Sequence, residues 1–187
     1  MDQRDLVERA KQGDHDAFAT LAGDAVARLD AAARLILRDP ELARDGVQDG
    51  FIRAWRTLPA LRDPDRFDAW LRRLVVHSCI DIMRRRRHRA IEVELTSIDG
   101  PAGVDFASAI VDRDLVDEAL RHLETESRAI VVMHYFLGMP LPEVAGLLGI
   151  PLGTAKSRLH RSLLAMRVAV GADETPIESS IAGGQLA

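Results

Sequence analysis

Apolar residues recur at three- and four-residue spacing along most of the chain, which is the period of an amphipathic helix. In the first half, a glycine, an Asp-Pro step and a polar turn divide this pattern into four predicted helices, over about residues 3–11, 14–38, 41–57 and 66–87. Asp14 or Asp16 is expected to cap the second helix. The step Asp39-Pro40 should end it, because a residue that precedes proline is pushed out of the helical region.

The third and fourth predicted helices each carry an apolar stripe that would pack inward. Trp55 and Trp70 fall on these stripes, so we expect both rings in the core rather than on a stacking surface. Cys79 is expected to be a small buried side chain, since nothing nearby suggests a nucleophile or a metal site. Four helices packed on one another predict a first domain over residues 1–89.

A second helical domain is predicted over residues 112–170. Residues 90–111 show no sustained period and contain an Asp-Gly-Pro turn, which indicates a linker. Helical spacing resumes at 115–123 and 127–136, whereas residues 171–187 predict a flexible tail. The predicted fold class is therefore all-α, with two small domains joined by an acidic linker.

Residues 141–167 predict a helix-turn-helix. Pro142 suits the first turn of a helix, and Ala145 is small enough to let a second helix cross closely. Gly149 lies where the turn between the helices needs a left-handed backbone.

The second helix of this motif would divide into an inward and an outward face. We expect the apolar residues to face inward, namely Leu152, Ala155 and Leu159. The outward face would carry residue types that contact base edges and phosphates in a major groove: Thr154, Lys156, Ser157, Arg158, His160 and Arg161. The alternative is an ordinary helical hairpin with a basic, solvated surface.

Charge is segregated along the chain, although the formal net charge is only −4. Residues 66–89 hold eight arginines against two aspartates, a local balance of +6, and residues 151–170 hold four basic residues and no acid. Between them, residues 90–127 hold ten acids and two arginines, a balance of −8. Two basic segments that flank an acidic one indicate two separate surfaces for a polyanion, although each charged face alone could simply be solvated.

Composition and motifs limit the class of protein. A single cysteine allows no intramolecular disulfide and suits a reducing compartment. No apolar run approaches the roughly 20 residues that span a bilayer, and the first residues lack a signal-peptide core, so we expect a cytoplasmic protein without a membrane segment. No nucleotide, metalloprotease or paired-cysteine motif occurs. We therefore expect no catalytic residue, metal or cofactor, and a helical nucleic-acid hydrolase is the disfavoured alternative.

Three stretches resemble the extracytoplasmic-function (group IV) sigma factors of the sigma-70 family, and the likeness runs from about Asp5 to Val170. E-L-A-R-D-G-V-Q-D-G-F-I-R-A-W-R is similar to region 2.2, F-D-A-W-L-R-R-L-V-V-H-S-C-I-D-I-M-R-R-R-R to regions 2.3 and 2.4, and P-L-G-T-A-K-S-R-L-H-R-S-L-L-A-M-R to region 4.2. The motifs lie in the family's order and spacing. The resemblance implies a factor that directs RNA polymerase to promoters without catalysis of its own.

The resemblance also implies roles for particular residues. Core polymerase, through the clamp helices of its largest subunit, would be contacted by Asp45, Gln48, Asp49 and Arg53. The −10 element, as single strand, would be contacted by Arg62, Arg72, Arg73, His77, Asp81, Arg84 and Arg85. The outward face of the helix-turn-helix would read the −35 element of promoter DNA. Family members are often held inactive by an anti-sigma factor, so the resemblance allows that partner too.

Several positions depart from the family's pattern. His77 stands where asparagine is usual, which leaves open the base preferred there, and Gly46 and Gly50 stand where larger aliphatic residues are usual. Each glycine would either cost its helix up to about 1 kcal/mol relative to alanine or let another backbone approach closely. The alternative function is a helix-turn-helix DNA-binding regulator that never associates with polymerase, for which the second half would suffice.

Overall fold

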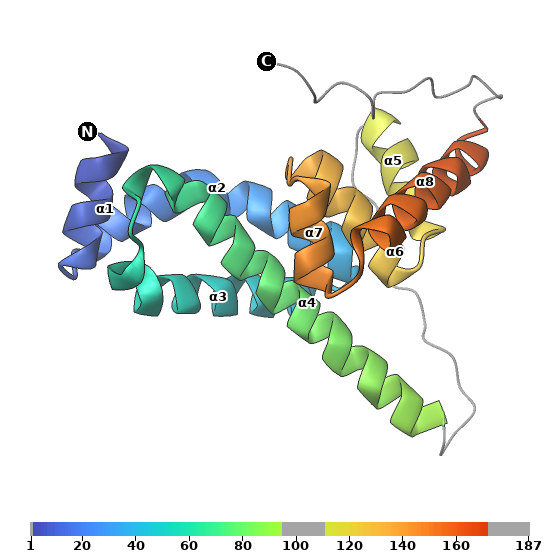
Figure 1. Ribbon diagram of the computed structural model, residues 1–187, viewed down its shortest axis with the longest axis horizontal. Helices are drawn as coiled ribbons and strands as arrows, with labels where there is room; N and C mark the ends of the chain where they lie inside the picture. The colour runs from blue at the N-terminus through green and yellow to red at the C-terminus, as the bar shows by residue number, and fades with distance from the viewer. Residues whose placement is uncertain (1, 95–110, 172–187) are drawn as a thin grey trace.

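The computed structural model describes residues 2–94 and 111–171, and the regular structure of these residues is helical throughout (Figure 1). The helices of the first half are α1 (Gln3–Lys11), α2 (His15–Leu37), α3 (Pro40–Thr57) and α4 (Phe67–Glu94), with the short 3-10 turns η1 (Leu58–Ala60) and η2 (Pro64–Arg66) before α4. Those of the second half are α5 (Val111–Arg121), α6 (Thr125–Val131), the π-helical turn η3 (Val132–Phe136), α7 (Leu141–Leu148) and α8 (Leu152–Ala169). The predicted all-α class is confirmed.

Aspartates begin the second and third helices where the sequence predicts. The Asp14 carboxylate accepts a hydrogen bond from the Ala17 backbone N–H at 3.0 Å, which satisfies one of the free donors at the start of α2. Arg38 ends α2 in the left-handed conformation, with φ of 52°. Asp39 then caps α3 ahead of Pro40, so the predicted break between the two helices is confirmed.

Close packing of α3 against α4 explains the two glycines that depart from the family's pattern. A Cβ placed on Gly50 would lie 2.6 Å from the Val75 Cα, and one on Gly46 would lie 3.3 Å from the Cys79 Sγ. The glycines therefore let the backbone of α4 approach α3. Cys79 is buried as predicted, and burial raises the pKa of its thiol to about 12.

The second domain contains the predicted helix-turn-helix, formed by α7 and α8. Gly149 joins the two helices with φ of 68°, and Ala145, Ala155 and Leu159 are buried between them and their neighbours. The inward orientation predicted for Leu152 is wrong, because 38% of this residue is exposed. A helical side chain covers the turn that precedes it, and Leu152, as the first residue of α8, has no such turn.

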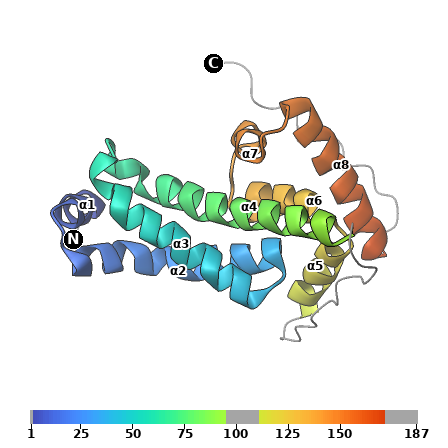
Figure 2. The same cartoon turned by 90° about the horizontal axis from the view of Figure 1, so that it is seen from below.

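The boundaries between domains differ from the prediction. Helix α4 continues to Glu94, five residues into the predicted linker, whereas the rest of that linker (95–110) and the predicted tail beyond Gly171 lie outside the described residues. The two domains also pack together: α6 and η3 lie on α2, and α7 lies beside α4 (Figures 1 and 2). Their buried apolar residues form one continuous cluster.

Candidate nucleic-acid interface

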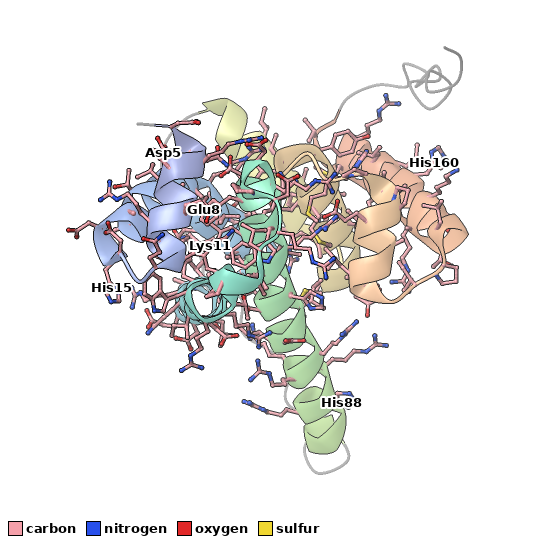
Figure 3. All side chains as sticks on the ribbon, turned by 60° about the vertical axis from the view of Figure 1, so that its left-hand side comes forward. Asp5, Glu8, Lys11, His15, His88 and His160 are labelled. Carbon is pink, nitrogen blue, oxygen red and sulfur yellow. The ribbon has the colours of Figure 1, made fainter. Side chains whose placement is uncertain are left out.

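One side of α8 is exposed, basic and free of acidic residues. Lys156, Ser157, His160 and Arg161 are all exposed, and Figure 3 shows His160 pointing away from the body of the protein. The Ser157 hydroxyl donates to the carbonyl of the half-buried Thr154 at 3.0 Å. This surface has the side chains and the shape that a major groove accepts.

Arg158 does not share this exposed side. Its side chain is 29% exposed, and its guanidinium forms an ion pair with Glu126 in the first turn of α6. The carbonyl of Arg158 also accepts a hydrogen bond from the Ser162 hydroxyl at 2.8 Å. The prediction that Arg158 faces outward is therefore wrong: the side chain fixes α8 on α6, and an opposite charge within the fold accounts for its orientation.

Several of the predicted −10 residues of α4 contact the second domain. Arg72 Nη1 donates to the Leu137 carbonyl at 3.2 Å, and Arg84 Nη2 donates to the Leu148 carbonyl at 3.2 Å. Arg73 forms an ion pair with Glu143 of α7, which raises the pKa of the Arg73 guanidinium. The structure thus brings these three arginines to one side of α4.

The other predicted −10 residues lie elsewhere. Arg62, before η2, and His77 of α4 are exposed, as a base-contacting side chain needs to be. Asp81, one turn beyond His77 and expected to contact the same strand, instead turns toward α3 and pairs with Arg53 at 3.3 Å. The Arg85 Nε donates to the Asp81 carbonyl on the same side.

The predicted polymerase-binding residues of α3 adjoin this pair. Arg53 also pairs with Asp49 at 2.9 Å, and the Asp49 carboxylate accepts a hydrogen bond from the buried Ser78 hydroxyl at 2.9 Å. Asp45, one turn before Asp49, and Gln48, directly before it, are exposed. Asp45, Asp49 and Arg53 therefore share a surface with Asp81 and Arg85, although the sequence assigns the two groups to different partners.

A groove of about 320 Å³ runs between α3 and α4 at this place. Its α3 wall carries two carboxylates and the Arg53 guanidinium, and its α4 wall carries guanidinium groups. The lining residues are Leu42, Asp45, Asp49, Arg53, Ile82, Arg85, Arg86 and Arg89. The groove is open to solvent and mixed in charge. Side chains of both signs can pair with a partner protein's surface that also carries both charges.

Sequence reasoning missed Arg128, which is the most deeply buried cation of the described residues at 6% exposure. It directly precedes the apolar run Ala129-Ile130-Val131-Val132, and a lone arginine at the edge of such a run is the signal that could have identified it. Among residues 2–94 and 111–171, no group of histidine, cysteine or carboxylate side chains could hold a metal ion. No helix in these ranges is both long and apolar enough to cross a membrane.

Comparisons with known proteins agree with the two-domain geometry. The family Sigma-70 region 2 matches residues 24–89, and Sigma-70, region 4 matches residues 113–166. The chain is 35% identical over 153 residues to the ECF RNA polymerase sigma factor SigM of Mycobacterium tuberculosis, covering 80% of this chain and 75% of SigM.

Two solved structures are also similar. CnrH, solved in complex with the cytosolic domain of CnrY, is 30% identical, with a TM-score of 0.59 over 92% of this chain and 99% of CnrH. The sigma factor RpoE, solved in complex with the anti-sigma factor NepR from Bartonella quintana, has a TM-score of 0.62 at 21% identity, over 83% of this chain and 99% of RpoE. The likeness to RpoE concerns the fold alone.

Proposed function

The chain belongs to the sigma-70 family, among its extracytoplasmic-function members, so it is an RNA polymerase sigma factor. On that premise we propose that residues 1–89 dock on core polymerase and capture the unpaired −10 strand, while residues 112–170 read the −35 duplex. The chain positions the polymerase and catalyses no step itself, and it acts in the cytoplasm, where polymerase works. The observation that carries this division is the pair of basic surfaces, one on α4 and one on α8, on separate domains.

In the second domain, the exposed side of α8 enters the −35 major groove. Lys156 and Arg161 supply the cationic contacts, and Ser157 and His160 supply hydrogen bonds to base edges or phosphates. Thr154 is suited to a phosphate near the start of α8, because the first backbone N–H groups of a helix attract anions. Arg158 is reassigned as a positioning residue, since Glu126 already neutralises it.

In the first domain, α4 holds the −10 strand. The exposed His77 contacts a base, while Arg62, Arg72, Arg73 and Arg84 neutralise the phosphates on either side. Asp81 and Arg85 keep a structural role, because Asp81 pairs with Arg53 of α3 and Arg85 lines the groove between α3 and α4.

Polymerase binds on the far side of α4, at the groove between α3 and α4. The exposed Asp45 and Gln48 make the first contacts, and Asp49 and Arg53 complete a polar surface that fixes the register of the complex. CnrH, which is 30% identical to this chain, was solved in complex with the cytosolic domain of CnrY, and this supports a further protein partner here. By the family resemblance, that partner is an anti-sigma factor.

Reconstitution tests this function. The full chain is mixed with core polymerase, the complex is isolated by gel filtration, and it transcribes genomic DNA fragments whose transcript 5′ ends are mapped. We expect a stable complex that initiates at sites sharing two upstream elements. Core polymerase alone is the control. A chain that binds duplex DNA yet neither co-elutes with polymerase nor supports initiation would instead be a plain DNA-binding regulator.

A further inference from the structure

The arginines of α4 that would meet the −10 strand are engaged by the second domain. Besides Arg72, Arg73 and Arg84, Arg87 pairs with Glu126 of α6 at 2.6 Å. At 3.6 residues per turn these four positions fall on one side of the helix, opposite the positions that face α3. One side of α4 therefore carries both the proposed DNA contacts and the contact with the second domain.

The groups that accept these hydrogen bonds resemble the phosphates that DNA would offer. Leu147 and Leu148 are the last residues of α7, and Leu137 directly follows η3. Carbonyls at the end of a helix lack partners within it and carry partial negative charge. Together with the carboxylates of Glu126 and Glu143, they present anionic oxygens to the guanidinium groups of α4. The second domain thus offers the same chemistry as a phosphate backbone.

A buried cation holds the two domains together on the side of α2. Arg128 of α6 donates from Nε and Nη2 to the Ile36 carbonyl at 3.2 and 3.1 Å, and from Nη1 to the Leu123 carbonyl at 2.9 Å. It thereby satisfies a carbonyl at the end of α2 from the other domain. Burial lowers the pKa of Arg128 to about 10, which still leaves it protonated at neutral pH. Arg38 and Asp117 add an ion pair at 3.5 Å beside it.

The contact around Arg72 is imperfect. Its Nε is buried, and no hydrogen-bond partner for it lies in the described part of the chain, although its Nη1 is satisfied. A buried donor without an acceptor disfavours the state that contains it. A phosphate can accept from both nitrogens at once, so DNA would satisfy the donor that the second domain leaves unpaired.

We propose that the free protein inhibits itself, with the second domain covering the −10 surface of α4 and binding Arg72, Arg73 and Arg84 through its own acceptors. This inference rests on the proposed −10 role of α4. Single-stranded DNA and the second domain compete for the same guanidinium groups, so the interface opens before or while the strand is captured.

A reversible cross-link that locks the two domains together tests the competition between the second domain and DNA. In the full chain, Arg38→Cys and Asp117→Cys are joined by a cleavable bismaleimide, and the native Cys79 is buried and does not interfere. The probe is a dye-labelled single-stranded oligonucleotide of mixed sequence, because phosphate contacts are independent of sequence. We expect the locked protein to bind it roughly ten times more weakly than the same protein after cleavage, as three phosphate contacts are withdrawn. Equal affinity of the locked and cleaved forms would overturn the proposal.

Variants that weaken the contact between the two domains should have the opposite effect on affinity for the oligonucleotide. Glu143→Gln removes the negative charge that pairs with Arg73 and should tighten binding of the oligonucleotide by roughly two- to fivefold, the size expected for one partly exposed ion pair. Glu8→Gln breaks the exposed pair with Lys11 in α1 with the same change in charge, so it controls for net charge. Arg128→Met should open the interface further, with circular dichroism confirming that the helices persist.

Dyes on Gln12→Cys and Val168→Cys, both at exposed positions, report the separation of the domains. The separation should increase in Glu143→Gln and stay unchanged in Glu8→Gln. Variants that open without tighter binding of the oligonucleotide would refute self-inhibition. Transcription by the wild-type holoenzyme is assayed in parallel. If the holoenzyme transcribes while the cross-link leaves oligonucleotide affinity unchanged, only this inference fails. A holoenzyme that never transcribes refutes the proposed function.

Discussion

Replacing Gly50 by alanine should destabilise the first domain, because α3 and α4 meet backbone to backbone at this residue. The new Cβ would lie 2.6 Å from the Val75 Cα, 2.7 Å from its Cγ2 and 3.0 Å from its backbone N. Two of these three atoms belong to the main chain. A change of rotamer cannot relieve the contact, so α4 itself has to shift within a tightly packed interior.

The size of the effect follows from two opposing contributions. Overpacking a core costs about 1–3 kcal/mol, with larger values on occasion, and alanine returns up to about 1 kcal/mol relative to glycine inside a helix. Because the clash is with backbone, we expect the upper part of the first range and a net loss of about 2 kcal/mol in the free energy of unfolding.

Two other glycines of the same domain provide matched controls. A Cβ on Gly46 is crowded by the ends of two side chains, Ile82 Cδ1 at 3.2 Å and Cys79 Sγ at 3.3 Å, whereas the nearest backbone atom, Cys79 Cα, lies at an ordinary contact distance of 3.8 Å. Gly46→Ala should therefore stay within about 0.5 kcal/mol of the wild type. Gly23, inside α2, has nothing within 4 Å, and Gly23→Ala should stabilise the domain by up to about 1 kcal/mol.

Urea unfolding followed by tryptophan fluorescence measures this series. The chain has two tryptophans, Trp55 and Trp70, and both lie in the first domain, so the signal reports on that domain. The expected order of stability is Gly23→Ala, then wild type and Gly46→Ala together, then Gly50→Ala. If Gly50→Ala were as stable as Gly23→Ala, the close approach of α3 and α4 would be refuted.

Three further predictions concern single side chains. Lys156→Ala should weaken holoenzyme binding to the mapped promoter and reduce the slope of log affinity against log salt concentration by about 1. Arg158→Ala should instead lower the melting temperature of the second domain. The reverse pattern would mean that α8 is rotated. Gln48→Arg and Asp49→Arg should both impair co-elution with core polymerase, but only Asp49→Arg should also lower stability, since it loses the Ser78 hydrogen bond. Because burial raises the pKa of Cys79 to about 12, the thiol stays protonated at pH 8. An aromatic disulfide reagent should therefore modify it only as urea unfolds the domain. Rapid modification of the folded protein would contradict the buried position of Cys79.

The elements of this fold could be predicted from local signals. Helical periodicity, aspartate caps and the Asp39-Pro40 step determine where helices begin and end, and these features act within a few residues of one another. The left-handed turn at Gly149 is likewise a local requirement that glycine meets at low cost. The helix-turn-helix was therefore visible in the sequence before any tertiary contact was known.

The orientation of charged side chains could not be predicted in the same way. Arg158 and Asp81 each lie at the edge of an exposed side, where either orientation satisfies the helical period. Glu126 and Arg53 decide between them, and these partners lie 32 and 28 residues away in sequence. A single sequence does not report such pairings, so both residues were assigned to DNA although each has an ionic partner in the fold.

On the proposed assignments, helix α4 serves two partners because its two sides are chemically independent. The side toward α3 carries Ser78, Asp81 and the glycine contacts, and the opposite side carries the arginines that hold either the second domain or DNA. On the proposed assignment, polymerase docks at the groove between α3 and α4 while the protein is still closed. Salt separates the later steps, because ions screen the buried Arg128 contacts little but weaken phosphate binding steeply. We therefore expect docking to require no opening of the interface, and strand capture to be the step most sensitive to salt.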